Sequence, residues 1–199
     1  IPGEQAFVHN ASLWGAAWCD FAGNELNDDD LVDQALGVAR QSSQEQAADG
    51  SWVYGARHHH QFIDGFHTGY NLEALCLLRD ATATSEFDEN IQKGYTYYVN
   101  TFFTENGTAR YYNNNVFPID MHSFAQAVFT LLKVGGTAKD LQLCNKVVQR
   151  AVHLMYLPDK GQFLYQQTRW LTNRINYTRW TQAWAYYSLA YYNRYCAEV

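Results

Sequence analysis

The sequence predicts an all-α protein built from repeated helical hairpins, with about seven helices. Two observations predict this fold. A segment that opens with a ring side chain and runs into apolar residues occurs four times, and a glycine-centred element occurs three times between its copies. Self-similarity at one period is the signature of a repeat architecture. No linker or composition shift interrupts the pattern, so we expect a single domain over residues 1–199.

The ring-led segments begin at His9, His67, His122 and Trp180, which are 58, 55 and 58 residues apart. In each copy, small and polar residues follow the ring and an apolar run follows them. A helix with this composition is apolar around much of its circumference, which is typical of a helix buried on most sides. We therefore expect these four segments to form an inner layer of helices.

A second helix is predicted after each of the first three ring-led segments, over Asp30–Gln46, Phe87–Phe103 and Ala138–Tyr156. Apolar residues recur there at helical spacing on one side only. Such amphipathic helices suit an outer layer. Acidic residues stand at the start of the first two, where they complement the positive end of the helix dipole. The predicted order alternates inner and outer helices, and it begins and ends with an inner one.

The glycine-centred element contains Gly50, Gly107 and Gly161, each after a polar residue and four residues before a tyrosine. A glycine in this setting is typical of a helix C-terminal turn with positive φ. The aromatic residues that follow favour a short extended piece that docks on the helices.

Composition excludes several classes of function. The net charge of −6 argues against a nucleic-acid groove, which needs clustered Lys and Arg. No apolar run is long enough to span a membrane. The four cysteines form no CxxC pair, and we expect Cys76, Cys144 and Cys196 to be buried free thiols. No phosphate-binding or dinucleotide motif occurs, so we expect neither a metal nor a cofactor.

Three motifs, Phe62–Tyr70, Pro118–Ser123 and Arg179–Trp184, resemble a bacterial (α/α)6-toroid family whose members are often encoded among polysaccharide-biosynthesis genes. More distantly, the organisation is similar to unsaturated glucuronyl hydrolases and to α/α-toroid polysaccharide lyases. The resemblance covers nearly the whole chain. It implies an α/α-toroid, an oligosaccharide or polysaccharide as partner and, with no signal peptide visible, the bacterial cytoplasm as the favoured location.

This chain departs from the complete toroid, which has six hairpins, because it carries about three and a half. We expect a fragment of a six-hairpin toroid or a shortened form of one. The start at Ile1, with no Met, favours a processed product or an excised piece. Missing repeats would leave apolar flanks of the first and last inner helices uncovered, and such flanks favour a homo-oligomer.

The predicted site lies in the loops that lead into the inner helices, because equivalent loops of a toroid surround one mouth of its cavity. Those loops carry Asp64, His67, Asp120 and His122. Two carboxylates in one cleft suit glycosidic chemistry, one as acid and the other as base or nucleophile. The histidines would orient them or carry protons. The predicted activity is that of a glycoside hydrolase or lyase on an acidic oligo- or polysaccharide.

Other residues are candidates for binding the substrate. Arg174 or Arg179 would hold a uronate carboxylate through paired hydrogen bonds. The candidates for stacking on sugar rings are Trp52, Trp170, Trp180 and Tyr70.

A lyase would use the same region differently. It needs a Tyr or His as base and an Asn, Gln or Arg to neutralise the uronate, for which the candidates are Tyr70, Asn71, His122 and Arg179.

Structural alternatives stand beside these hypotheses. Asp64 and Asp120 precede their inner helices, and Asp is a common N-cap. Most of the aromatic residues would serve core packing. A non-catalytic glycan-binding or assembly protein, or a helical scaffold that binds another protein, is the competing function. His58-His59-His60 is interpreted as a solvated loop in preference to a zinc site with His67.

Overall fold

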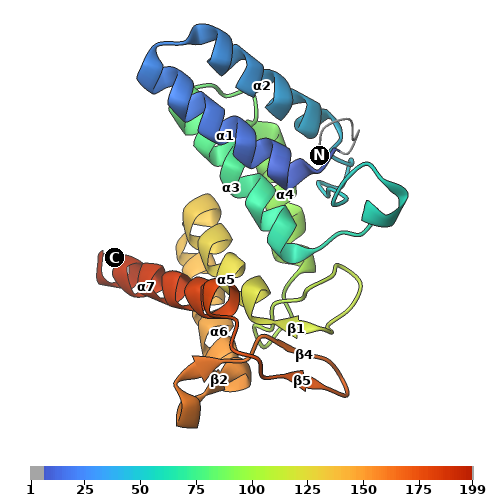
Figure 1. Cartoon of the computed structure of the whole chain (residues 1–199), viewed down its shortest axis with the longest axis vertical. Helices are drawn as coiled ribbons and strands as arrows, with labels where there is room; N and C mark the ends of the chain where they lie inside the picture. Colours follow the sequence, from blue (N-terminus) through green and yellow to red (C-terminus); the bar gives the residue numbers. More distant parts are fainter. Residues whose placement is uncertain (1–6, 199) are drawn as a thin grey trace.

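The computed structural model describes residues 7–198, and these form an open arc of helical hairpins (Figure 1). The inner helices are α1 (His9–Leu26), α3 (Gly65–Thr82), α5 (Met121–Phe129) and α7 (Ala183–Glu198). The outer helices are α2 (Asp29–Gln44), α4 (Asp88–Thr101) and α6 (Ala138–Met155). Two short π-helical segments extend the inner layer: η2 (Thr130–Gly135) continues α5, and η4 (Thr178–Gln182) leads into α7. The predicted alternation of inner and outer helices is confirmed.

The inner helices form one continuous layer, in which α1 packs on α3, α3 on α5, and α5 on α7. In Figure 1 the hairpins α1–α2, α3–α4 and α5–α6 follow one another along the arc, and α7 crosses beside α5. Neighbouring inner helices begin on the same side of the arc because every repeat has the same order of elements. Residues about one repeat apart in sequence therefore meet at the helix N-termini.

Short strands and 3-10 turns fill the connections between helices. β1 (Ile119–Asp120), β4 (Gln166–Gln167) and β5 (Thr172–Asn173) form an antiparallel sheet in the order β1-β4-β5. A second pair joins β2 (Tyr156–Leu157) to β3 (Gln162–Phe163). The 3-10 turns are η1 (His58–His60) and η3 (Pro158–Lys160).

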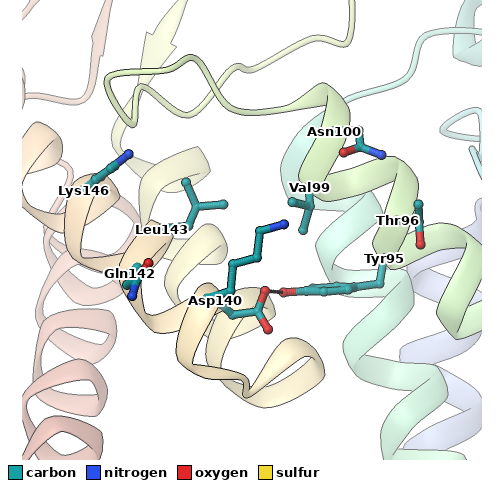
Figure 2. Close-up of a pocket in the computed structure, with 9 residues that line it drawn as sticks. Tyr95, Thr96, Val99, Asn100, Asp140, Gln142, Leu143 and Lys146 are labelled. Atoms are coloured by element: carbon teal, nitrogen blue, oxygen red, sulfur yellow. Dashed lines mark hydrogen bonds between the residues drawn. The ribbon is translucent and has the colours of Figure 1, made fainter.

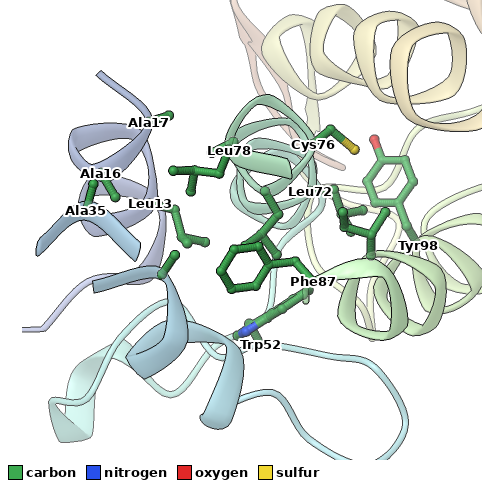
Figure 3. Packing of buried hydrophobic residues seen from close by; sticks show 14 of the residues in the cluster. Leu13, Ala16, Ala17, Ala35, Trp52, Leu72, Cys76, Leu78, Phe87 and Tyr98 are labelled. Atoms are coloured by element: carbon green, nitrogen blue, oxygen red, sulfur yellow. The ribbon is translucent and has the colours of Figure 1, made fainter. Parts of the chain in front are cut away.

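Two buried clusters hold the hairpins together. The first lies among α1 to α4 and includes Leu13, Leu72 and Phe87 (Figure 3). The second lies among α5, α6 and α7, and Tyr95 and Val99 of α4 pack against both clusters. The apolar cores therefore run continuously from one repeat to the next.

Trp52 belongs to the first cluster, which corrects its predicted role as a sugar-stacking residue. Its side chain is 2% exposed, and its indole N–H donates to the carbonyl of Ser42 at 2.9 Å. The extended piece that follows Gly50 turns this ring inward onto the helices. Cys196 also differs from expectation: Cys76 and Cys144 are buried, but Cys196 is exposed near the end of α7.

The glycines of the repeated element have positive φ, as predicted, at +92° for Gly50, +84° for Gly107 and +58° for Gly161. Their position differs from the prediction, because Gly50 and Gly107 lie several residues beyond the ends of α2 and α4. A Cβ on Gly50 would lie 2.3 Å from the carbonyl oxygen of Lys93 in α4. A Cβ on Gly107 would lie 2.7 Å from that of Lys146 in α6.

Each of these two glycines thus docks a repeat against the next outer helix. A Cβ on Gly161 would meet nothing within 4 Å among the described residues, where no further outer helix follows α6.

The ends of the inner layer are uncovered, as predicted. On α1, Trp18 is 65% and Phe21 is 56% exposed, and on α7 Tyr186 is 78% exposed. By contrast, most residues of α3 and α5 are buried, because other elements pack on both sides of these helices. Within residues 7–198, no helix has the length and apolar character that crossing a membrane requires.

The repeat geometry predicts unequal effects for one substitution at equivalent positions. Gly107→Ala places a Cβ against the α6 backbone in addition to the strain of positive φ, so we expect a loss of at least about 2 kcal/mol in unfolding free energy. Gly161→Ala adds only the conformational strain, about 1 kcal/mol. Urea denaturation of both variants measures the difference. Equal losses would contradict the docking role of Gly107.

Candidate functional site at the inner-helix N-termini

Two buried aspartates begin the central inner helices. Asp64 caps α3: one carboxylate oxygen accepts the backbone N–H of His67 at 2.8 Å, and the other lies 2.7 Å from Nδ1 of that ring. Asp120 caps α5: it accepts the backbone N–H of His122 at 2.8 Å and Nε2–H of Gln166 at 2.9 Å. Each aspartate is 2% exposed. The capping interpretation is confirmed, and the catalytic roles predicted for the two carboxylates stay predictions.

The imidazole of His67 is held in one orientation and still reaches solvent. An ionised carboxylate only accepts hydrogen bonds, so Nδ1–H of His67 donates to Asp64. The ring is also flanked by Phe66 and Tyr54, with centroids at 4.2 Å and 4.5 Å. The side chain is 21% exposed. The arrangement therefore leaves Nε2 as the ring nitrogen available to a bound molecule.

A second imidazole forms the back of the site. Nε2 of His122 lies 2.6 Å from the hydroxyl of Tyr70, and Trp180 stacks on the ring with centroids 4.2 Å apart and planes at 1°. Burial lowers the pKa of His122 to about 3, helped by the nearby His67, and burial raises the pKa of Tyr70. Both groups are neutral at pH 7, and the tautomer of His122 decides which of them donates in the hydrogen bond between them.

The β1–β4 pairing brings a polar side chain to the second cap. Asp120 is opposite Gln166 in the antiparallel register, which explains the hydrogen bond between them. Burial raises the pKa of Asp120 to about 6, against the opposing effect of the hydrogen bonds from His122 and Gln166. The buried carboxyl therefore ionises close to neutral pH.

Aromatic rings line a cavity of about 370 Å³ beside these groups. Its walls are Asn10, Ala11, Trp14, Tyr70 and Trp184. The side-chain oxygen of Asn10 and the indole N–H of Trp14 are buried and have no partner within the described residues. The Tyr70 ring contacts both indoles, with centroids 6.4 Å from Trp14 and 5.8 Å from Trp184.

The structure brings together most of the residues predicted from the loops. Phe66 contacts the rings of both His67 and His122, so the two imidazoles share one wall. Arg179 lines a further cavity of about 460 Å³ together with Trp180 and residues 176–178.

Other candidates lie apart from this cluster. Trp170 is 89% exposed in the turn between β4 and β5, and Arg174 is exposed just after β5. Asn71 is buried in α3, and its side-chain oxygen has no partner among residues 7–198. His9 is also buried and lies 3.2 Å from the hydroxyl of Ser42.

The three adjacent histidines form η1, which supports the interpretation as a loop. The ring of His60 packs on Tyr54 at 4.9 Å, and His58 is exposed. Across residues 7–198, no group of three or more Cys, His, Asp or Glu side chains is arranged to hold a metal ion.

The sequence interpretation missed Trp14 and Trp184. Trp184 follows Trp180 by four residues, and Tyr70 follows His67 by three. Residues at these spacings lie on the same face of a helix, one turn further in. In these two repeats the ring at the start of the segment therefore indicates a second ring one turn further in, whereas Trp14, five residues after His9, has no such signal.

Comparison with solved structures confirms the predicted fold. The chain is similar to an unsaturated glucuronyl hydrolase specific for heparin (TM-score 0.76, 13% identity), with 100% of this chain and 62% of that one covered. It is also similar to the unsaturated glucuronyl hydrolase of Bacillus sp. GL1 (TM-score 0.67, 11% identity; 85% and 58% covered). Cellobiose 2-epimerase from Bacillus thermoamylovorans gives a TM-score of 0.69 at 10% identity, with 87% and 51% covered.

The class that the fold defines is therefore the α/α-toroid, in an incomplete form. The chain spans about three fifths of the length of the glucuronyl hydrolases. The sequence itself matches no family model and no curated protein. The resemblance that the motifs suggested is thus confirmed at the level of a distant structural relationship.

The pKa of Asp120 predicts a pH-dependent effect of Asp120→Asn. A carboxyl whose pKa is raised by folding contributes stability at low pH and loses that contribution as pH rises through about 6. Asparagine caps helices well and is never charged. We therefore expect the variant to be more stable than the wild type at pH 7.5, by about 2 kcal/mol at most, and the gain to vanish near pH 4.

Urea denaturation at the two pH values tests this expectation. His122 is present in both proteins, so its own titration cancels from the comparison. A variant that is less stable than the wild type by the same amount at both pH values would contradict it.

Proposed function

We propose that this protein acts on an acidic oligo- or polysaccharide bound at the mouth formed by His67, Tyr70, His122 and Trp180. The observation that carries the proposal is the pair of oriented imidazoles beside an aromatic cavity. Asp64 fixes one of them with Nε2 free, and Tyr70 holds the other.

The cavity has the chemistry of a sugar site. Sugar rings present apolar C–H faces, and Trp14, Tyr70 and Trp184 supply aromatic surfaces of matching size. The amide side chain of Asn10, in the cavity wall, would bond to hydroxyls. The similar structures include proteins named for glucuronyl and cellobiose substrates, which supports a saccharide as ligand.

The reaction that the geometry supports best is proton abstraction beside a uronate carboxylate, followed by elimination. Nε2 of His67 would take the proton, and the neutral Tyr70 hydroxyl would donate one to the leaving oxygen. Arg179, at the edge of the neighbouring cavity, would neutralise the carboxylate and so lower the pKa of the adjacent C–H. Hydrolysis by two free carboxylates receives less support, because Asp64 and Asp120 are both buried and hydrogen-bonded as caps.

A second candidate is a glycan-binding protein without turnover, from a polysaccharide pathway. The capping role of Asp64 and Asp120 favours this candidate, because both carboxylates are already hydrogen-bonded at helix ends. The sugar-binding cavity would be unchanged, and the histidines would then serve only as hydrogen-bonding groups.

Substitutions at the mouth separate the two candidates. His67→Gln removes the proton acceptor, so we expect turnover of a short oligogalacturonate to fall by at least about 100-fold, with affinity changed only a few-fold. Trp180→Ala removes the ring stacked on His122 and should weaken both. Trp18→Ala, which removes an exposed indole on α1, is the matched control and should change neither.

Turnover is followed by the absorbance of the unsaturated product, and affinity by calorimetry. Binding of acidic glycans by the wild type without any turnover would sink the enzyme proposal and leave the binding protein. If neither binding nor turnover occurs, both candidates fail.

A further inference from the structure

A groove separates the outer helices α4 and α6, and none of the residues that line it belongs to the N-terminal mouth (Figure 2). A cavity of about 450 Å³ lies between them, and a second of about 370 Å³ continues it along α6. Lys146 lines both, so the two form one elongated depression. The volume is in the range of ligand sites in other proteins.

The equivalent groove one repeat earlier, between α2 and α4, is closed by side chains. Arg40 and Glu86 form an ion pair across it at 2.7 Å. Asn90 of α4 donates to the carbonyl of Ser43 at 3.1 Å, and the side chain of Gln46 donates to the carbonyl of Asn90 at 3.0 Å. Between α2 and α4, therefore, the protein's own polar side chains fill the space that is open between α4 and α6.

In the α4–α6 groove the bridging contacts lie towards its two ends. Nε–H of Arg150 donates to the hydroxyl of Thr108, in the loop after α4, at 3.0 Å. The Tyr95 hydroxyl donates to Asp140 at 2.7 Å (Figure 2). Asp140 also accepts from Thr137 in the capping box of α6, so its charge is engaged within the protein. Lys139 and Lys146 are exposed along the rest of the groove.

The cations follow one stripe of α6. Lys139, Lys146 and Arg150 stand at spacings of seven and four residues, which places them on the same face of the helix. Glu105 is the acidic residue that lines the second cavity. The lining carries three cations against the two acidic side chains of Asp140 and Glu105, whereas the chain as a whole has a net charge of −6.

Amide and hydroxyl side chains stand between the cations. In the larger cavity these are Thr96, Asn100 and Gln142, and Gln149 lines the smaller one. Such groups both donate and accept hydrogen bonds, which suits the closely spaced hydroxyls of a sugar chain. Carboxylates or sulfates on the sugars would pair with the lysines and Arg150.

We infer that the α4–α6 groove is a second saccharide-binding site, which holds a stretch of an anionic polysaccharide outside the N-terminal mouth. Binding in the groove does not depend on catalysis at the mouth. The site would keep a polymer on the protein while another part of the chain occupies the mouth, and it raises the effective concentration of the polymer there.

Charge-neutral substitutions test the groove directly. The double variant Lys139→Gln, Lys146→Gln removes two cations from it, and Lys93→Gln, Lys160→Gln removes two exposed cations from elsewhere as the matched control. The probe is a short oligogalacturonate, titrated by calorimetry into the wild type and into each double variant, with and without the Trp180→Ala substitution. Cellohexaose is the uncharged probe and polyglutamate the non-saccharide polyanion. Circular dichroism verifies that each variant is folded.

We expect the groove variant to bind oligogalacturonate at least about tenfold more weakly in the Trp180→Ala background, because each lost cation removes a charge-assisted contact. The control variant should retain wild-type affinity, and higher salt should weaken binding. Equal losses in the groove and control variants would reduce the effect to net charge and overturn the inference. The inference would also be overturned if polyglutamate bound with the same affinity as oligogalacturonate and its binding depended in the same way on Lys139 and Lys146.

The result also separates the groove from the mouth. If Trp180→Ala abolishes all binding and the groove variant binds like the wild type, the groove inference fails and the proposed function stands. If only the groove variant loses binding, the proposed function fails and the groove remains.

Discussion

The hydrogen bonds of Asp64 and Asp120 at the N-termini of α3 and α5 fix the geometry of the mouth. A helix begins with backbone N–H groups that have no partner in the helix, and an aspartate before the first turn satisfies them. The cap also sets the position of the residues that follow it. His67 is three residues after its cap and His122 two residues after its own, so both imidazoles start from fixed points. For Asp64 the same carboxylate orients the ring.

The repeat then brings these fixed points together. Because α3 packs on α5 and α5 on α7, rings from three repeats meet: Phe66 contacts His122, and His122 contacts Trp180. Uncovered aromatic residues on α1 and α7 mark the two ends of the inner layer. The glucuronyl hydrolase structures to which this chain is similar are longer, and the chain covers roughly three fifths of their length. The mouth described here is formed by that part alone.

The sequence predicted the order and approximate bounds of the helices because repeats align their turns, caps and apolar faces. It also allowed both roles for the aspartates, since the same residue type suits a cap and an acid. It could not place Trp52 or Trp14 correctly. Periodicity shows which face of a helix is apolar, but the partner of that face depends on how the repeats pack. The positive φ of Gly107 was predictable, whereas its contact with the carbonyl of Lys146 is a property of the packed repeats.

The central claim is that the rings at the inner-helix N-termini form a saccharide site. The six tryptophan indole N–H signals test it directly by nuclear magnetic resonance during titration with oligogalacturonate. The account predicts that the signals of Trp14, Trp180 and Trp184 shift together with one affinity. Those of the buried Trp52 and of Trp18, which does not line the cavity, should stay in place. Saturable binding that leaves the first three signals unmoved would contradict it.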